Sequence, residues 1–73
     1  MTLADLDRGA GARVAALPDD PDAASQCASM GLTVGASATV LRRAPFGGPL
    51  HVRVGDVELA VGRELALRVV VSP

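Results

Sequence analysis

The side chains that bind transition metals are scarce in this sequence and lie far apart. It contains one histidine, His51, and one cysteine, Cys27. Asp56 and Glu58 are the acidic residues that follow His51 most closely. A stable metal site needs three or four converging ligands, so we interpret His51 as an exposed strand residue and Cys27 as a small, half-buried helix residue. His51, Glu58 and Cys27 stay as second-choice metal ligands, and no cofactor is expected.

No group of residues has the pattern of an active site. The serines have no nearby histidine in the order of a catalytic triad, and no paired carboxylates frame a cleft. The segment Gly9-Ala10-Gly11 lacks the third glycine of a dinucleotide-binding turn, and no phosphate-binding loop is present. We therefore expect a binding protein rather than an enzyme.

The residues best suited to bind another protein surround Phe46, the only aromatic residue of the chain. Aromatic residues and arginine are enriched at the energetic centres of protein interfaces. Two interpretations stay open for Phe46: it is exposed at the loop tip as an interface anchor, or it folds under and plugs one end of the core. The candidate partner-binding residues are Arg42, Arg43, Pro45, Phe46, Gly47, Gly48 and Pro49.

Length and composition restrict the class of protein. The chain has 73 residues, of which 49% are apolar, and a net charge of −1. Binding to nucleic-acid phosphates needs a basic excess and base stacking needs aromatic residues, so no nucleic-acid partner is expected. A lone cysteine excludes an internal disulfide. Because the acidic N-terminal segment and the short apolar runs are not typical of a signal peptide or a membrane span, we expect a cytoplasmic protein.

The positive charges gather in the second half of the chain. Residues 37–73 contain five of the seven arginines. Three of these, Arg42, Arg43 and Arg53, are expected on two paired strands. Such a group can face an acidic surface of a partner, although charged side chains on the outer face of a sheet more often only contact water.

One helix is well marked at both ends. Asp20 is placed as its N-cap, and Pro21 suits the first helical position. We expect this helix to end at Met30, because Gly31 suits the left-handed residue that follows a helix, with Leu32 folding back onto it. The structural motif at this corner comprises Met30, Gly31, Leu32 and Gly35.

Alternation of apolar and polar residues predicts strands over 12–17, 37–44, 50–54, 57–61 and 67–71, with a short turn over 62–66. A two-residue turn at Gly55-Asp56 pairs Val54 with Val57, Arg53 with Glu58, Val52 with Leu59 and His51 with Ala60. A slip of one residue would bury the charges, so this register is strongly specified. A sheet of short strands with one apolar face removes its exposed edge strands by closing into a barrel. The predicted fold is mostly β: a small SH3-like β-barrel of about five strands, with one short helix inserted after the first strand.

Three segments stand in an order and spacing that resemble the FeoA family. They are Thr2-Leu3-Ala4-Asp5-Leu6 with Gly9, Met30-Gly31-Leu32 with Gly35, and Arg43-Ala44-Pro45-Phe46-Gly47-Gly48-Pro49. The resemblance continues through the alternating segment that starts at Leu50, and it covers essentially the whole chain.

The resemblance implies one SH3-like domain over residues 1–73. FeoA proteins are cytoplasmic and accompany the bacterial ferrous iron transporter FeoB. The implied function is therefore regulation of ferrous iron uptake by protein–protein contact with the cytosolic GTPase region of FeoB. The protein would approach the membrane only through this partner, and exposed barrel edges would also allow a homo-oligomer.

One segment departs from the family pattern. Family members usually carry leucine and basic residues just before Met30, whereas Gln26-Cys27-Ala28-Ser29 is small and uncharged. We therefore expect the helix to bury less apolar area than in relatives. Two alternatives to a transporter adaptor stay open: a small-barrel nucleic-acid-binding module, and a domain that binds metal directly and senses iron.

Overall fold

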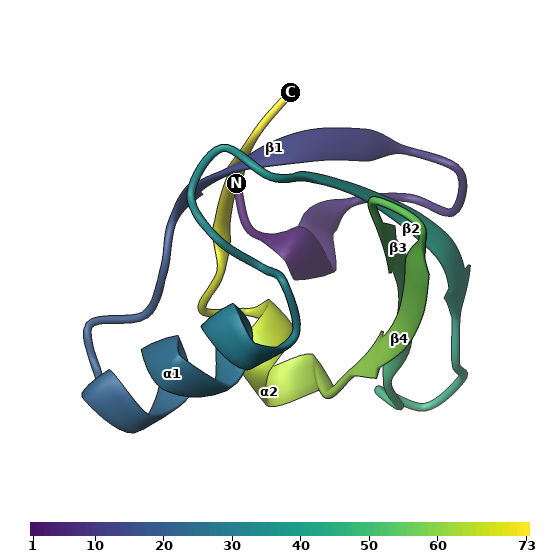
Figure 1. The fold of residues 1–73 in the computed structure, drawn as a ribbon. Helices are drawn as coiled ribbons and strands as arrows, with labels where there is room; N and C mark the ends of the chain where they lie inside the picture. Colours follow the sequence, from purple (N-terminus) through teal and green to yellow (C-terminus); the bar gives the residue numbers. More distant parts are fainter.

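An antiparallel sheet of five strands forms the framework of the computed structural model, which describes residues 1–73. The strands are β1 (Gly11–Ala16), β2 (Ser37–Arg43), β3 (Leu50–Val54), β4 (Val57–Val61) and β5 (Val70–Ser72). Their order in the sheet is β4-β3-β2-β1-β5. The sheet curls strongly, so that β4 and β1 lie on different sides of the molecule with the core between them (Figure 1). The predicted mostly β fold with one short helix after the first strand is confirmed.

The helix α1 (Pro21–Ser29) has the predicted signals at both ends. The carboxylate of Asp20 accepts a hydrogen bond from the backbone N–H of Asp22 at 3.4 Å. At the other end Gly31 has a φ of 85°, and the N–H of Leu32 donates to the carbonyl of Cys27 at 2.9 Å. This is the Schellman arrangement, which reverses the chain after a helix. It turns Leu32 inward, where its side chain is fully buried.

The β3–β4 hairpin has the predicted register. The pairs are Leu50 with Val61, His51 with Ala60, Val52 with Leu59, Arg53 with Glu58 and Val54 with Val57. Burial decreases along its apolar face, because Leu50 and Val61 lie in the core whereas Val57 near the turn is 58% exposed. The hairpin therefore extends past the core at its turn.

The C-terminal segment differs from its prediction. Residues expected as a turn form a helical turn, α2 (Arg63–Ala66), and the backbone continues to turn through Arg68, whose N–H donates to the carbonyl of Leu65 at 2.9 Å. The expected strand 67–71 was wrong at its start, since β5 begins at Val70. Leu67 is 53% exposed because the helical turn, with its period of 3.6, points it away from the core.

The N-terminal segment completes the barrel. A single turn of 3₁₀ helix, η1 (Leu3–Asp5), lies within the curve of the sheet (Figure 1). The N–H of Leu3 donates to the carbonyl of Val69 at 2.9 Å, and the N–H of Val71 donates to the carbonyl of Met1 at 2.9 Å. These bonds place the buried Leu3 and Leu6 at the end of the core. Neither α1 nor α2 is long and apolar enough to cross a membrane.

Candidate functional site

The loop between β2 and β3 is a tight turn with Phe46 at its tip. The N–H of Gly48 donates to the carbonyl of Pro45 at 3.1 Å, and the N–H of Ala44 donates to the carbonyl of Pro49 at 3.0 Å. The two central residues both have positive φ, 60° at Phe46 and 72° at Gly47, as a type I′ turn requires. The side chain of Phe46 is fully exposed. Of the two interpretations left open, the one in which Phe46 plugs the core is wrong.

The conformation of Phe46 carries a cost without a packing benefit. The left-handed region costs an L-residue about 1–2 kcal/mol, and glycine or asparagine occupies it far more readily. Phe46 is the only non-glycine residue with a positive φ in this structure. Backbone strain of this kind concentrates at functional sites, and here it holds an aromatic ring out in solvent.

A β-bulge decides which of the two adjacent arginines is available to a partner. Val40 lies opposite Val52 but Arg42 lies opposite His51, so β2 contains one extra residue, Leu41. Simple alternation would turn Arg42 inward like Val40 and Arg43 outward. The bulge reverses this, because bulges change the direction of the side chains that follow. Arg42 is exposed on the outer face of the sheet, and Arg43 is half-buried.

Arg43 holds the N-terminal segment in place. Its Nη1 donates to the carbonyl of Ala4 at 2.8 Å and to the carbonyl of Leu6 at 2.6 Å. These carbonyls lie at the end of η1, where the helical turn leaves them without backbone partners. The structure thus gives Arg43 a role in packing, and its contact with a partner stays a prediction.

The glycines of the loop allow its close turn. A Cβ built on Gly48 would lie 2.8 Å from the Cβ of Ala44 and 3.2 Å from the carbonyl oxygen of Pro45. Gly47 has open space around it and is needed for its positive φ instead. The loop residues from Pro45 to Pro49 therefore form one small edge with Phe46 at its tip.

The motif around Gly31 lies elsewhere. A Cβ built on Gly31 would lie 3.8 Å from Cγ1 of Val54, at the end of β3 that joins the hairpin turn. The Phe46 loop joins β3 at its other end, at Leu50. Gly35 has a φ of 91° and donates its N–H to the carbonyl of Val14 at 2.8 Å. Leu32 is buried and Met30 is half-buried, so this motif shapes the barrel and is not part of the loop edge.

The metal candidates do not form a metal site. His51 and Glu58 line a shallow hollow on the outer face of the sheet, together with Arg8, Leu41 and Arg42. No three histidine, cysteine, aspartate or glutamate side chains converge anywhere in the structure. The guanidinium groups in the hollow repel a cation, so these residues do not fit a divalent metal ion.

Cys27 is more deeply buried than expected. Its side chain is fully inaccessible on the inner side of α1, whereas the sequence suggested half burial. This burial raises the pKa of its thiol, because a thiolate loses its hydration in an apolar environment. The thiolate is the form that binds metals and reacts, so Cys27 is held in its inert form.

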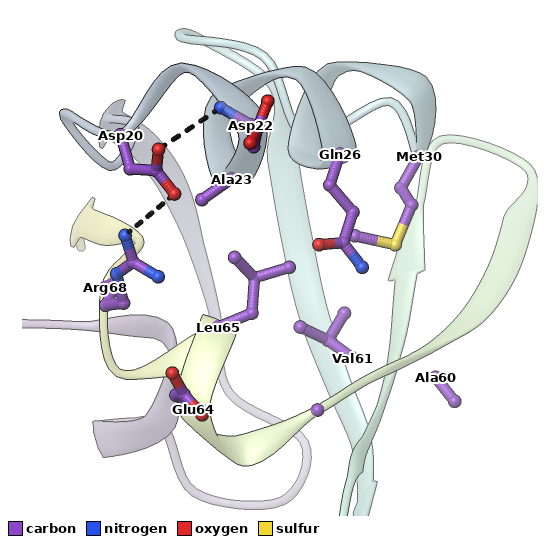
Figure 2. Close-up of a pocket in the computed structure, with 11 residues that line it drawn as sticks. Asp20, Asp22, Ala23, Gln26, Met30, Ala60, Val61, Glu64, Leu65 and Arg68 are labelled. Atoms are coloured by element: carbon purple, nitrogen blue, oxygen red, sulfur yellow. Dashed lines mark hydrogen bonds and ion pairs between the residues drawn. The ribbon is translucent and has the colours of Figure 1, made fainter.

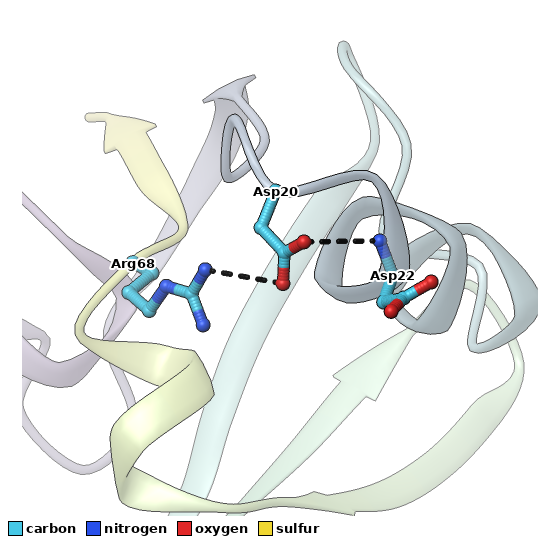
Figure 3. Close-up of polar contacts among 3 residues, drawn as sticks. All are labelled: Asp20, Asp22 and Arg68. Carbon is cyan, nitrogen blue, oxygen red and sulfur yellow. Dashed lines mark hydrogen bonds and ion pairs between the residues drawn. The ribbon is translucent and has the colours of Figure 1, made fainter.

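A groove of about 390 Å³ separates α1 from α2 and the end of β4. The side chains of Gln26 in α1 and of Met30, directly after α1, extend toward Val61 and Leu65 across it (Figure 2). Two of its lining residues form an ion pair: Nη2 of Arg68, which follows α2, lies 3.7 Å from Oδ2 of Asp20, the N-cap of α1 (Figure 3). Sequence reasoning did not place this groove, because its lining residues come from segments that are far apart in the chain.

The sequence model of the FeoA domain matches residues 1–73. This chain belongs to the FeoA family. No curated protein matches the sequence.

Solved FeoA structures share the fold of this FeoA chain. A crystal structure of an iron uptake regulatory protein, FeoA, has a TM-score of 0.90 and 37% identity over 97% of this chain and 93% of that one. The solution structure of FeoA from Chlorobium tepidum has a TM-score of 0.88 and 32% identity over 97% of this chain and 68% of that one. The zinc complex of FeoA from Stenotrophomonas maltophilia, an SH3 domain protein considered as a bacterial ferrous iron transport activating factor, has a TM-score of 0.84. It is 29% identical over 99% of this chain and 89% of that one.

The same FeoA fold also occurs within a larger regulator. A manganese-dependent transcriptional repressor matches with a TM-score of 0.87 and 27% identity over 100% of this chain. The match covers 41% of the repressor.

Proposed function

We propose that this protein is an accessory factor of bacterial ferrous iron uptake that binds the cytosolic GTPase region of a FeoB-type transporter. Its membership of the FeoA family supports the link to ferrous iron transport. The observation that carries the proposed contact is the fully exposed Phe46 in a left-handed conformation. The contact edge comprises Arg42, Arg43, Pro45, Phe46, Gly47, Gly48 and Pro49.

The chemistry of this edge suits an interface anchor. A phenylalanine ring that moves from water into a partner's pocket contributes about 1.5–3 kcal/mol. Two backbone hydrogen bonds close the turn around Phe46 and keep its ring exposed before the partner binds. Such preorganisation lowers the entropy cost of association. Arg42 stands exposed beside the loop and adds a charged group of the kind that fixes the orientation of a partner.

The proposal also locates the protein in the cell. Residues 1–73 act as one domain in the cytoplasm and reach the membrane surface only through the transporter. The protein has no catalytic role of its own, and it acts by changing the activity of the transporter's GTPase region.

An amide NMR titration tests this function. The labelled protein is titrated with the cytosolic region of a FeoB-type transporter from the same cell. We expect localised shifts between Arg42 and Leu50. The variant Phe46→Asn keeps the turn and removes the ring, and it should weaken binding by about tenfold or more.

Val34→Asn is the matched control, because Val34 is 64% exposed and lies outside the proposed edge. It should leave binding unchanged. Localised shifts elsewhere would keep the transporter as partner but reject this edge. A folded wild-type protein that shows no shifts at high micromolar concentration of the transporter region would reject the function.

A further inference from the structure

The shallow hollow on the outer face of the sheet is a second feature that could contact a partner. It has a volume of about 420 Å³ and is lined by Arg8, Leu41, Arg42, His51 and Glu58. Arg42, near the end of β2, belongs both to this hollow and to the edge proposed around Phe46. The proposed function uses Arg42 alone, and it leaves the rest of this hollow without a role.

Two local features of the backbone, a β-bulge and a hydrogen-bonded turn, form the hollow. The bulge at Leu41 sets Arg42 on the outer face opposite His51. The turn that carries Arg8 is fastened to the same strand, because the N–H of Gly9 donates to the carbonyl of Val40 at 2.7 Å and the N–H of Val40 donates to the carbonyl of Ala10 at 2.9 Å. These bonds bring two guanidinium groups that are far apart in sequence to one hollow.

Neither of these guanidinium groups has an acceptor within the chain. The structure has two ion pairs, Arg53 with Glu58 and Arg68 with Asp20. Arg8 and Arg42 take part in neither, and they donate no hydrogen bond to the chain. The single carboxylate at the hollow, Glu58, lies 3.6 Å from Nη2 of Arg53. Two unpaired positive charges at one site repel each other, and an incoming anion relieves this repulsion.

We propose that this hollow binds carboxylate side chains of an acidic segment of the partner while Phe46 anchors beside it. Guanidinium groups bind carboxylates through paired, charge-assisted hydrogen bonds. A protein segment suits the hollow better than a nucleic acid, since the net charge of −1 gives a polyanion no long-range attraction. The only phenylalanine, tyrosine or tryptophan is Phe46 in the loop, so the hollow lacks the series of aromatic rings on which successive bases stack in nucleic-acid-binding grooves.

This inference rests on the proposed function, and charge-neutral variants test it separately. Affinity for the transporter's cytosolic region is measured for Arg8→Gln and Arg42→Gln at low and high salt. Each variant should weaken binding about two- to fivefold at low salt, and the loss should shrink as salt screens the charges. Glu58→Gln should tighten binding, because it removes the only negative charge at the hollow.

Arg68→Gln is the matched control. It removes the same charge from an exposed arginine that lies outside the hollow, so it should leave affinity unchanged. If Phe46→Asn weakens binding but Arg8→Gln and Arg42→Gln do not, the transporter contact stands and the carboxylate site is rejected. Equal losses from all three arginine variants would also reject the site, because they would show a general effect of net charge.

A second probe decides the matter even if the transporter region does not bind. The labelled protein is titrated with an oligoglutamate peptide and, for comparison, with oligoglutamine. Amide shifts at Arg8, Leu41, Arg42 and His51 with oligoglutamate alone support the carboxylate site. Their absence rejects it, and so does a single-stranded oligonucleotide that shifts the same amides at lower concentration.

Discussion

Phe46 stands in a backbone conformation that an L-residue rarely adopts, and it makes no packing contact there in return. Function and stability should therefore respond in opposite directions at this residue. We predict that Phe46→Asn raises the free energy of unfolding by up to about 1 kcal/mol, because asparagine occupies the left-handed region more readily. The same variant loses the proposed partner contact. Urea unfolding measures the first effect, and a stability loss above the experimental error would show that the ring packs in solution.

Asp5 makes the free energy of unfolding depend on pH. The hydrogen bond from the backbone N–H of Thr2 at 2.8 Å, supported by the Thr2 hydroxyl at 3.2 Å, holds the pKa of its carboxyl below the usual value. A lowered pKa stabilises the folded state above the unfolded pKa of about 3.9, and the contribution is lost as pH falls through the folded pKa. In urea unfolding, the wild type should thus have a higher free energy of unfolding than Asp5→Asn at pH near 6, and this difference should shrink at pH near 3. A difference that is the same at both values would contradict this account.

The β2–β3 loop is an element whose sequence is restricted by close contacts. A Cβ on Gly48 would lie 2.8 Å from the Cβ of Ala44, and forcing extra volume into a tight site costs about 1–3 kcal/mol. We predict that Gly48→Ala destabilises the protein by this amount in urea unfolding.

The double variant Gly48→Ala with Ala44→Gly identifies the cause. It removes the methyl group that Gly48→Ala would meet, so part of the lost stability should return. Additive losses in this double-mutant cycle would place the strain elsewhere.

At the scale of the whole molecule, one side chain joins the N-terminal segment to the middle of the chain. Arg43 ties the end of β2 to the carbonyls of Ala4 and Leu6, and removal of a charged donor from a partly buried site costs about 1.5–3 kcal/mol. We predict that Arg43→Ala lowers the free energy of unfolding by this amount. Arg42→Ala, one residue away, should leave stability unchanged and weaken partner binding. Urea unfolding and the transporter titration check the pair together, and the reverse result would overturn the assignment of the bulge.

Much of this fold could be predicted from local patterns. The α1 helix follows from Asp20, Pro21 and Gly31, whose effects are confined to the helix ends. The β3–β4 register follows from a two-residue turn between alternating strands. The start of β5 could not be found in this way, because alternation at Leu67 and Val69 is compatible with both a strand and the end of a helical turn. In the folded protein α2 also contacts η1 from the other end of the chain, which no local pattern encodes.

The sequence by itself determined α1, the strands β2 to β4, the hairpin register and the loop in which Phe46 would lie, because caps, turns and alternation act between near neighbours. Tertiary structure decided what these residues can do. It showed that Phe46 and Arg42 are exposed and that Arg43 is half-buried. It also brought Arg8 beside Arg42. The physical reason is that one extra residue in β2 changes the face of every residue after it, and only the pairing with β3 and the N-terminal turn fixes where that residue goes.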